Sequence, residues 1–97
     1  MSDIVVRRSH GMTLKRARTA AEQIAAELAE EFDFTYEWTG NTLNFKRMGV
    51  TGTIVVEKKV LDINAKIGFL LRPIKARIER EIHRFCDEKF GPAESGG

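Results

Sequence analysis

The chain has 97 residues, of which 42% are hydrophobic and 31% are charged, and its formal net charge is +2. This size and composition predict a single small globular domain and argue against a large internal active-site cavity, while the weak positive charge does not by itself indicate nucleic-acid binding. No run approaches the roughly 20 consecutive apolar residues that a membrane span needs.

The first eight residues show no secretion signal, because a basic stretch followed by an apolar run and a small-residue cleavage site is missing. We therefore expect a cytoplasmic protein without a transmembrane segment. Cys86 is the single cysteine, which excludes an intramolecular disulfide and a multi-cysteine metal site.

Residues 4–9 alternate between two faces as a strand does, and we expect Ile4 and Val6 to face the core. Residues 10–12 break this pattern, and Thr13 is a suitable N-cap for a helix. Apolar residues then recur at helical spacing, which predicts that one stripe of the helix packs on a sheet. The stripe consists of Leu14, Ala17, Ala21, Ile24, Ala25, Leu28 and Phe32.

Basic residues gather near the start of this helix, and no carboxylate lies among them between Ile4 and Ala21. Together with the free N–H groups of the first helical turn, they suit an anion. We predict an anion-binding or partner-binding surface, here called the basic set, which consists of Arg7, Arg8, His10, Arg16 and Arg18. The alternative is that the arginines bridge to acids elsewhere in the fold and that His10 is a structural residue at the strand end.

Residues 36–69 contain four short alternating runs separated by turn residues, which predicts an antiparallel meander. Gly40-Asn41, Met48-Gly49 and Lys58-Lys59 are the expected turns. Gly52 is expected to mark a bulge or a close contact with a helix. The predicted core positions of the four runs are Tyr36, Trp38, Leu43, Phe45, Val50, Ile54, Val56, Leu61, Ile63, Ala65, Ile67 and Phe69.

A second helix is predicted after this meander, with Pro73 at its first position and Gly91-Pro92 at its end. Its apolar stripe consists of Leu71, Ile74, Ile78, Ile82 and Phe85. The fold class is therefore α+β, a two-layer sandwich in which an antiparallel sheet of about five strands carries two helices on one face. The predicted order is strand, helix, four strands, helix, with one domain over residues 1–90 and a flexible tail over residues 91–97.

Catalysis by a nucleophile requires a base within reach and a third group that orients the base, and no such set is recognisable in the chain. His83 and Cys86 lie three residues apart on the second helix, but two ligands are half a metal site at most. We expect no enzyme activity, no cofactor and no metal, and we expect Cys86 to be a buried or half-buried thiol.

The junction between the last strand and the second helix joins a dense apolar run to basic residues. If it is exposed, it would adsorb to an apolar or anionic surface with its cations outward. The alternative is that the apolar run fills the corner between the strand and the helix. This attachment corner consists of Phe69, Leu70, Leu71, Arg72 and Lys75.

One set of residues, spread over nearly the whole chain, is notable for its order and spacing. The set consists of Arg7, Arg8, Ser9, His10, Leu14, Ala17, Arg18, Tyr36, Trp38, Gly40, Leu43, Phe45, Gly49, Val50, Gly52, Gly68, Phe69, Leu70, Leu71, Ile78, Glu79, Ile82 and Asp87. In these residues the chain resembles the polyhydroxyalkanoic acid system family, small bacterial proteins associated with genes of storage-polyester granules. Asn41 stands where the family pattern leads us to expect an aspartate. The resemblance implies a cytoplasmic bacterial protein linked to granule formation or its regulation, and it brings no catalytic residues.

We therefore expect a non-enzymatic accessory protein that binds the polyester granule surface or a granule-associated protein. One alternative is a carrier that holds a small hydrophobic or acyl ligand in a helix-grip-like pocket, with the anionic end near Arg8 or Arg18. A further alternative is a nucleic-acid-binding regulator, which rests on the basic clusters alone. Two copies could also pair through a sheet edge or the open sheet face.

Overall fold

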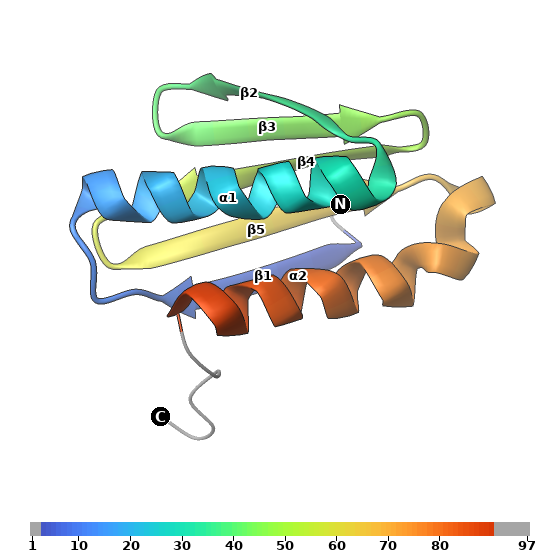
Figure 1. Ribbon diagram of the computed structural model, residues 1–97. Coiled ribbons are helices and arrows are strands. Elements are labelled where there is room, and N and C mark those ends of the chain that lie inside the picture. Colours follow the sequence, from blue (N-terminus) through green and yellow to red (C-terminus); the bar gives the residue numbers. More distant parts are fainter. Residues whose placement is uncertain (1–2, 91–97) are drawn as a thin grey trace.

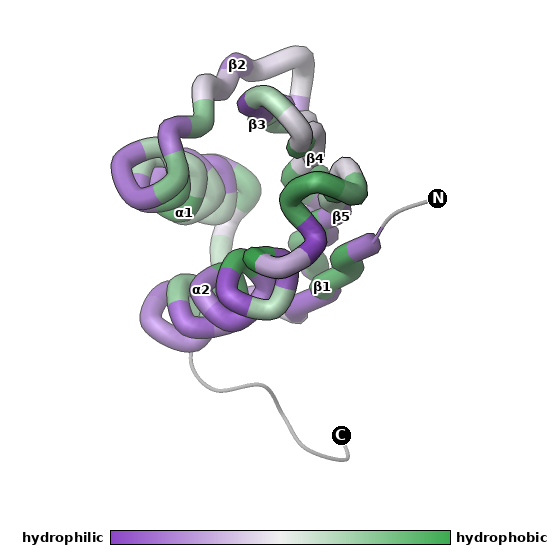
Figure 2. The backbone as a smooth tube through the Cα atoms, turned by 90° about the vertical axis from the view of Figure 1, so that its right-hand side faces the viewer, coloured by the Kyte–Doolittle hydropathy of each residue, from purple (hydrophilic) through white to green (hydrophobic). Residues whose placement is uncertain are grey.

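The computed structural model describes residues 3–90 and has two layers, a five-stranded antiparallel sheet and two α-helices on one of its faces (Figures 1 and 2). The predicted α+β class and element order are confirmed, whereas the predicted tail, residues 91–97, lies outside the described residues. The elements are β1 (Ile4–Ser9), α1 (Leu14–Phe32), β2 (Thr35–Thr39), β3 (Thr42–Arg47), β4 (Val50–Val56), β5 (Val60–Ile67), the 3₁₀ helix η1 (Phe69–Ile74) and α2 (Lys75–Phe90).

The sheet has the strand order β1-β5-β4-β3-β2, so the first strand of the chain pairs with the last. Ile4 lies opposite Ala65 and Val6 lies opposite Ile63 in this pairing. The alternation predicted for β1 is confirmed, because Ile4 and Val6 are buried and Val5 is exposed. β1 and β2 are the two edges of the sheet, and α1 packs over β2, β3 and β4 while α2 packs beside β1.

The start of α1 and the two glycine turns follow the predicted local chemistry. The hydroxyl of Thr13 accepts a hydrogen bond from the Arg16 backbone N–H at 3.2 Å, which caps α1. Gly40 and Gly49 have φ angles of 60° and 88°, a region that glycine enters without the steric cost other residues meet. The apolar stripe of α1 is buried as predicted except at Leu14, which is partly buried.

The junction after β5 differs from its prediction. β5 ends at Ile67, so Phe69 is not a core residue of the strand, and α2 begins at Lys75 rather than at Pro73. Pro73 lies inside η1, where the Leu71 N–H donates to the Gly68 carbonyl at 2.9 Å. A short 3₁₀ turn joins the strand to the helix, and the Pro73 nitrogen, which cannot donate, needs no partner there.

Two further predictions about the sheet are wrong. Tyr36 is 37% exposed, because it lies on edge strand β2, which has a neighbouring strand on one side only. Gly52 marks no bulge, since it pairs in register with Phe45. A Cβ atom at Gly52 would lie 2.7 Å from Cε2 of Phe45 and 2.6 Å from the Asn64 carbonyl oxygen, so the close contact is with an aromatic ring of the neighbouring strand.

The space between the sheet and the helices is filled by apolar side chains. Leu43, Ile54 and Ile63 from the sheet and Leu28 and Ile82 from the helices are fully buried there. Within the part of the chain that the structure describes, no helix is long and apolar enough to cross a membrane.

Candidate functional site

The attachment corner exposes the two apolar side chains at its start. Phe69 and Leu70 are each 78% exposed at the beginning of η1, whereas Leu71 is partly buried against the core. Figure 2, which views the molecule from this end, shows the hydrophobic segment of η1 at the front, beside the ends of β4 and β5. The apolar run therefore does not fill the corner between strand and helix with all of its residues.

A contact between two glycines holds the corner in place. The Gly68 N–H donates to the Gly49 carbonyl oxygen at 2.7 Å, which joins the start of η1 to the β3–β4 turn. Leu71 packs against Gly49, where an added Cβ atom would lie 2.7 Å from the Leu71 Cδ1 atom. Because Leu71 turns inward onto this glycine, Phe69 and Leu70 are left on the outside of the turn.

Basic residues flank this exposed pair. Arg72 forms an ion pair with Asp3 at 3.3 Å, and the other carboxylate oxygen of Asp3 accepts from the Ile67 N–H at 2.7 Å. The hydrogen bond from Ile67 is the largest cause that lowers the pKa of Asp3, and the positive charges of Arg72, Lys75 and Lys66 lower it further. The corner therefore combines exposed apolar groups with a largely cationic flank.

The structure does not bring the five residues of the basic set to one surface. Arg7 lies on the uncovered face of the sheet and pairs with Asp62 at 3.1 Å, whereas Arg8 points to the opposite, helix-covered face. Arg16 is exposed on α1. These cations are directed to different sides of the molecule.

Arg8 links β1 to α2. Its side chain is 9% exposed, and its Nη1 atom donates to Asp87 at 2.8 Å. The Nη2 atom lies 3.1 Å from the Nδ1 atom of His83, which must accept because a guanidinium only donates. Cys86 is fully buried on the same helix, and burial raises the pKa of its thiol to about 11. At neutral pH this thiol is protonated and is a poor nucleophile.

His10 and Arg18 have structural contacts. The Nε2 atom of His10 lies 2.7 Å from the Glu57 carbonyl oxygen, and its Nδ1 atom lies 3.3 Å from the Met12 backbone nitrogen. Nε2 therefore donates and Nδ1 accepts, which defines a neutral tautomer. This arrangement matches the structural alternative for His10.

Arg18 clamps the β2–β3 hairpin onto α1. Its Nη1 atom donates to the Gly40 carbonyl at 2.8 Å and to Oδ1 of Asn41 at 2.6 Å. The guanidinium lies 4.3 Å from the centre of the Trp38 ring, and the Trp38 indole N–H donates to Glu22 at 2.7 Å. An asparagine oxygen at position 41 serves this clamp, as an aspartate would.

An open groove of about 680 Å³ lies on the sheet face that the helices leave uncovered. Its floor is formed mainly by side chains of β2, β3, β4 and β5 that point away from the helices, and most of these carry hydroxyl, amide or charged groups. They are Thr35, Glu37, Asn44, Lys46, Thr51, Thr53, Asn64 and Lys66. Tyr36, Phe45 and Gly52 also line the groove, so it offers a ligand apolar as well as polar surface.

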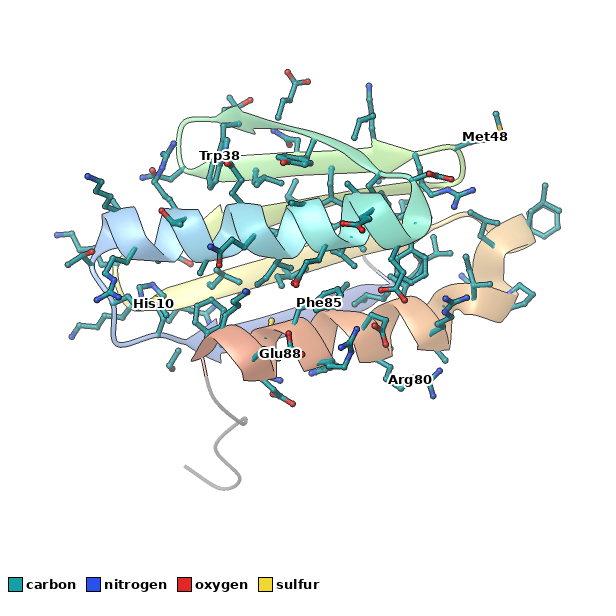
Figure 3. The ribbon with its side chains drawn as sticks, in the orientation of Figure 1. His10, Trp38, Met48, Arg80, Phe85 and Glu88 are labelled. Atoms are coloured by element: carbon teal, nitrogen blue, oxygen red, sulfur yellow. The ribbon has the colours of Figure 1, made fainter. Side chains whose placement is uncertain are left out.

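Met48 is the exposed apolar residue that the sequence reasoning did not select. It is 91% exposed and projects from the β3–β4 turn (Figure 3). The pattern marked it only as a turn residue, and its position beside η1 follows from the hydrogen bond between Gly68 and Gly49, which links residues far apart in the chain.

Within residues 3–90 no group of three or more His, Cys, Asp or Glu residues is placed to hold a metal ion.

A family model described as "Putative polyhydroxyalkanoic acid system protein" matches residues 4–90. This range includes every helix and strand of the fold and the whole attachment corner. Comparisons with curated proteins and with solved structures gave no significant match. The resemblance found in the sequence is confirmed.

Proposed function

Because the chain belongs to the polyhydroxyalkanoic acid system protein family over residues 4–90, we propose that it is a non-enzymatic, cytoplasmic accessory protein that attaches to polyester granules or to granule proteins. The attachment corner makes the contact. Its apolar side chains meet the granule, and the neighbouring cations meet the charged groups of the granule coat.

The exposure of Phe69 and Leu70 is the observation that carries this proposal. Leaving a large apolar side chain in water costs about 1.5–3 kcal/mol relative to burying it, and adjacent exposed apolar residues mark interaction sites. The contact of Leu71 with Gly49 presents the pair in one orientation, so attachment does not require the turn to rearrange.

The sheet–helix interface gives no support to the acyl-carrier alternative. Leu43, Ile54 and Ile63 fill the sheet side of this interface and are fully buried. Arg8, one of the two cations expected to hold the anionic end of a ligand, is engaged by Asp87, and Arg18 is engaged by the β2–β3 hairpin. A ligand would have to displace these contacts and part of the core.

Binding to granules tests the proposal. Purified protein should co-sediment with isolated polyester granules. Phe69→Asp combined with Leu70→Asp should reduce the bound fraction about tenfold or more, because each change removes an apolar group that would be buried against the granule and adds a negative charge. Leu71 is left unchanged because it supports the turn.

The matched control is Gln23→Glu combined with Ala26→Glu, which adds the same two negative charges on the exposed side of α1. Thermal unfolding of both variants should remain close to that of the unaltered protein. Equal granule binding by the corner variant and the control variant would show that the attachment corner does not make the contact with the granule.

A further inference from the structure

The exposed apolar surface extends beyond the attachment corner to Met48. Gly68 and Gly49 are hydrogen-bonded at 2.7 Å, so Phe69, which follows Gly68, and Met48, which precedes Gly49, lie at the same end of the molecule. Together with Leu70 they are three of the five large hydrophobic residues that are exposed in the described part of the chain. We call Met48, Phe69 and Leu70 the apolar tip.

The tip is built from two turns, and several backbone groups beside it are hydrogen-bonded within the molecule. The N–H groups of Gly68 and Leu71 both donate within the molecule, to Gly49 and Gly68 respectively. Arg47 donates from Nε to the Met48 carbonyl at 3.3 Å and from Nη1 to the Phe32 carbonyl at 2.9 Å. These backbone groups would therefore lose little hydration if the tip entered an apolar layer.

Cations lie on both sides of the tip. Lys46 and Arg47 share a shallow hollow with Met48, and Asp33 also lines it. On the η1 side the positive charges of Arg72, Lys75 and Lys66 all act on the single carboxylate of Asp3. The two neighbourhoods, around Met48 and around Asp3, together hold five cations and two carboxylates.

We propose that the apolar tip inserts into an anionic phospholipid surface while the flanking cations bind its phosphate head groups. This inference rests on the proposed attachment function and names the chemistry of the surface. Charge complementarity favours a lipid surface over the polymer itself. An uncharged polyester carries no negative groups to pair with the cations, whereas an anionic lipid layer presents phosphates above an apolar interior. A nucleic acid would complement the cations but not the exposed Met48, Phe69 and Leu70.

Vesicle sedimentation tests the proposal. The full chain should bind vesicles of phosphatidylcholine with phosphatidylglycerol and should bind vesicles of phosphatidylcholine alone much more weakly. Lys75→Gln should weaken binding about fivefold at low salt, the loss expected for one surface cation. Higher ionic strength should reduce binding of the unaltered protein.

The contribution of the apolar residues is tested with Met48→Ser, which should weaken vesicle binding several-fold without altering thermal unfolding. Val5→Ser is the matched control, because Val5 is an exposed apolar residue of β1 outside the tip. Insertion itself is detected by Phe69→Trp, whose emission should be quenched by brominated lipid chains. The native Trp38, held between Arg18 and Glu22, should not be quenched.

Lipid-free polyester particles separate this inference from the proposed function. Binding to the particles without binding to anionic vesicles would overturn the lipid inference and leave polyester attachment standing. Failure to bind vesicles, particles or isolated granules would overturn both. Vesicle binding that is unchanged by Met48→Ser and by the removal of phosphatidylglycerol would also overturn the lipid inference.

Discussion

Arg8 shows how a single charged residue can belong to the core of a small domain. It follows Ile4 and Val6 on the buried face of β1, where the guanidinium meets Asp87 and His83 of α2. Removing water from an arginine is costly unless charged and hydrogen-bonding partners replace it. Arg8 and Asp87 stand near opposite ends of the chain and both belong to the residues that carry the family resemblance.

Replacing Asp87 should therefore destabilise the protein more than replacing a surface partner. Asp87→Asn removes the negative charge beside the buried guanidinium, and we expect a loss of about 1–2 kcal/mol in the free energy of unfolding, because Asp87 is itself half exposed. Asp62→Asn breaks the exposed pair with Arg7 and should cost under about 1 kcal/mol. Urea unfolding followed by Trp38 fluorescence measures both, and similar losses would contradict a core role for Arg8.

The buried thiol of Cys86 should make the free energy of unfolding depend on pH in the alkaline range. An unfolded thiol ionises near pH 9, whereas burial raises the pKa in the folded protein to about 11. Between these values the unfolded state releases the proton first, so the free energy of unfolding should fall as pH rises from about 9 to 11.

The Cys86→Ala variant should show a weaker decrease over this pH range, although its stability at neutral pH will be lower because of the cavity. Urea unfolding at pH 8, 9 and 10 measures the difference. Parallel curves for the variant and the unaltered protein would show that the thiol does not ionise differently in the two states.

At the scale of elements, glycines determine how closely strands and turns approach. Phe45 of β3 lies over Gly52 of β4, and Leu71 of η1 lies over Gly49 of the β3–β4 turn. In both places a large apolar side chain occupies the space that a side chain at the glycine would take. Aromatic cover over a glycine on a neighbouring strand also protects a weak point of the sheet.

Gly52→Ala should consequently reduce the free energy of unfolding by about 1–3 kcal/mol, since the new methyl group would meet Phe45 and the Asn64 carbonyl oxygen. Gly11→Ala is the control, because no atom lies within 4 Å of a Cβ built at Gly11. Guanidinium unfolding of the two variants measures the contrast. A stable Gly52→Ala protein would mean that Phe45 moves aside at little cost.

The elements whose sequence pattern is local were predictable. Thr13, the alanine-rich stripe of α1 and the glycines at positions 40 and 49 specify the N-cap, the buried helix face and the hairpin turns through contacts within a few residues. The partners of Arg8 and Arg18 were not predictable, because they lie 79 and 22 residues away. Met48 was missed for the same reason, since only tertiary structure places it beside η1.

For the molecule as a whole, the two ends of strands β4 and β5 differ in their exposed side chains. The apolar tip and its cations lie at one end, where β4 begins and β5 ends, and the Lys58-Lys59 turn lies at the other end of these two strands. The uncovered sheet face between them carries mainly threonine, asparagine and charged side chains. Attachment through the tip would leave this face in water and free to meet other proteins.

The affinity of such an attachment should be modest. Three inserted side chains contribute about 1.5–3 kcal/mol each at most, each flanking cation adds about 1 kcal/mol near an anionic surface, and association itself costs several kcal/mol. We therefore expect reversible binding that strengthens when several copies act together. Dilution of protein-loaded granules should release the protein, and retention after extensive washing would contradict this expectation.

Site-specific cross-linking on granules tests the central claim most directly. A photoreactive benzoylphenylalanine is placed at Phe69 in one variant and at Lys58, at the opposite end of β4 and β5, in another, and both are irradiated after binding to isolated granules. We predict that position 69 forms cross-links to granule material and that position 58 forms few or none. Equal cross-linking at both positions, or cross-linking at position 58 alone, would contradict attachment through the apolar tip.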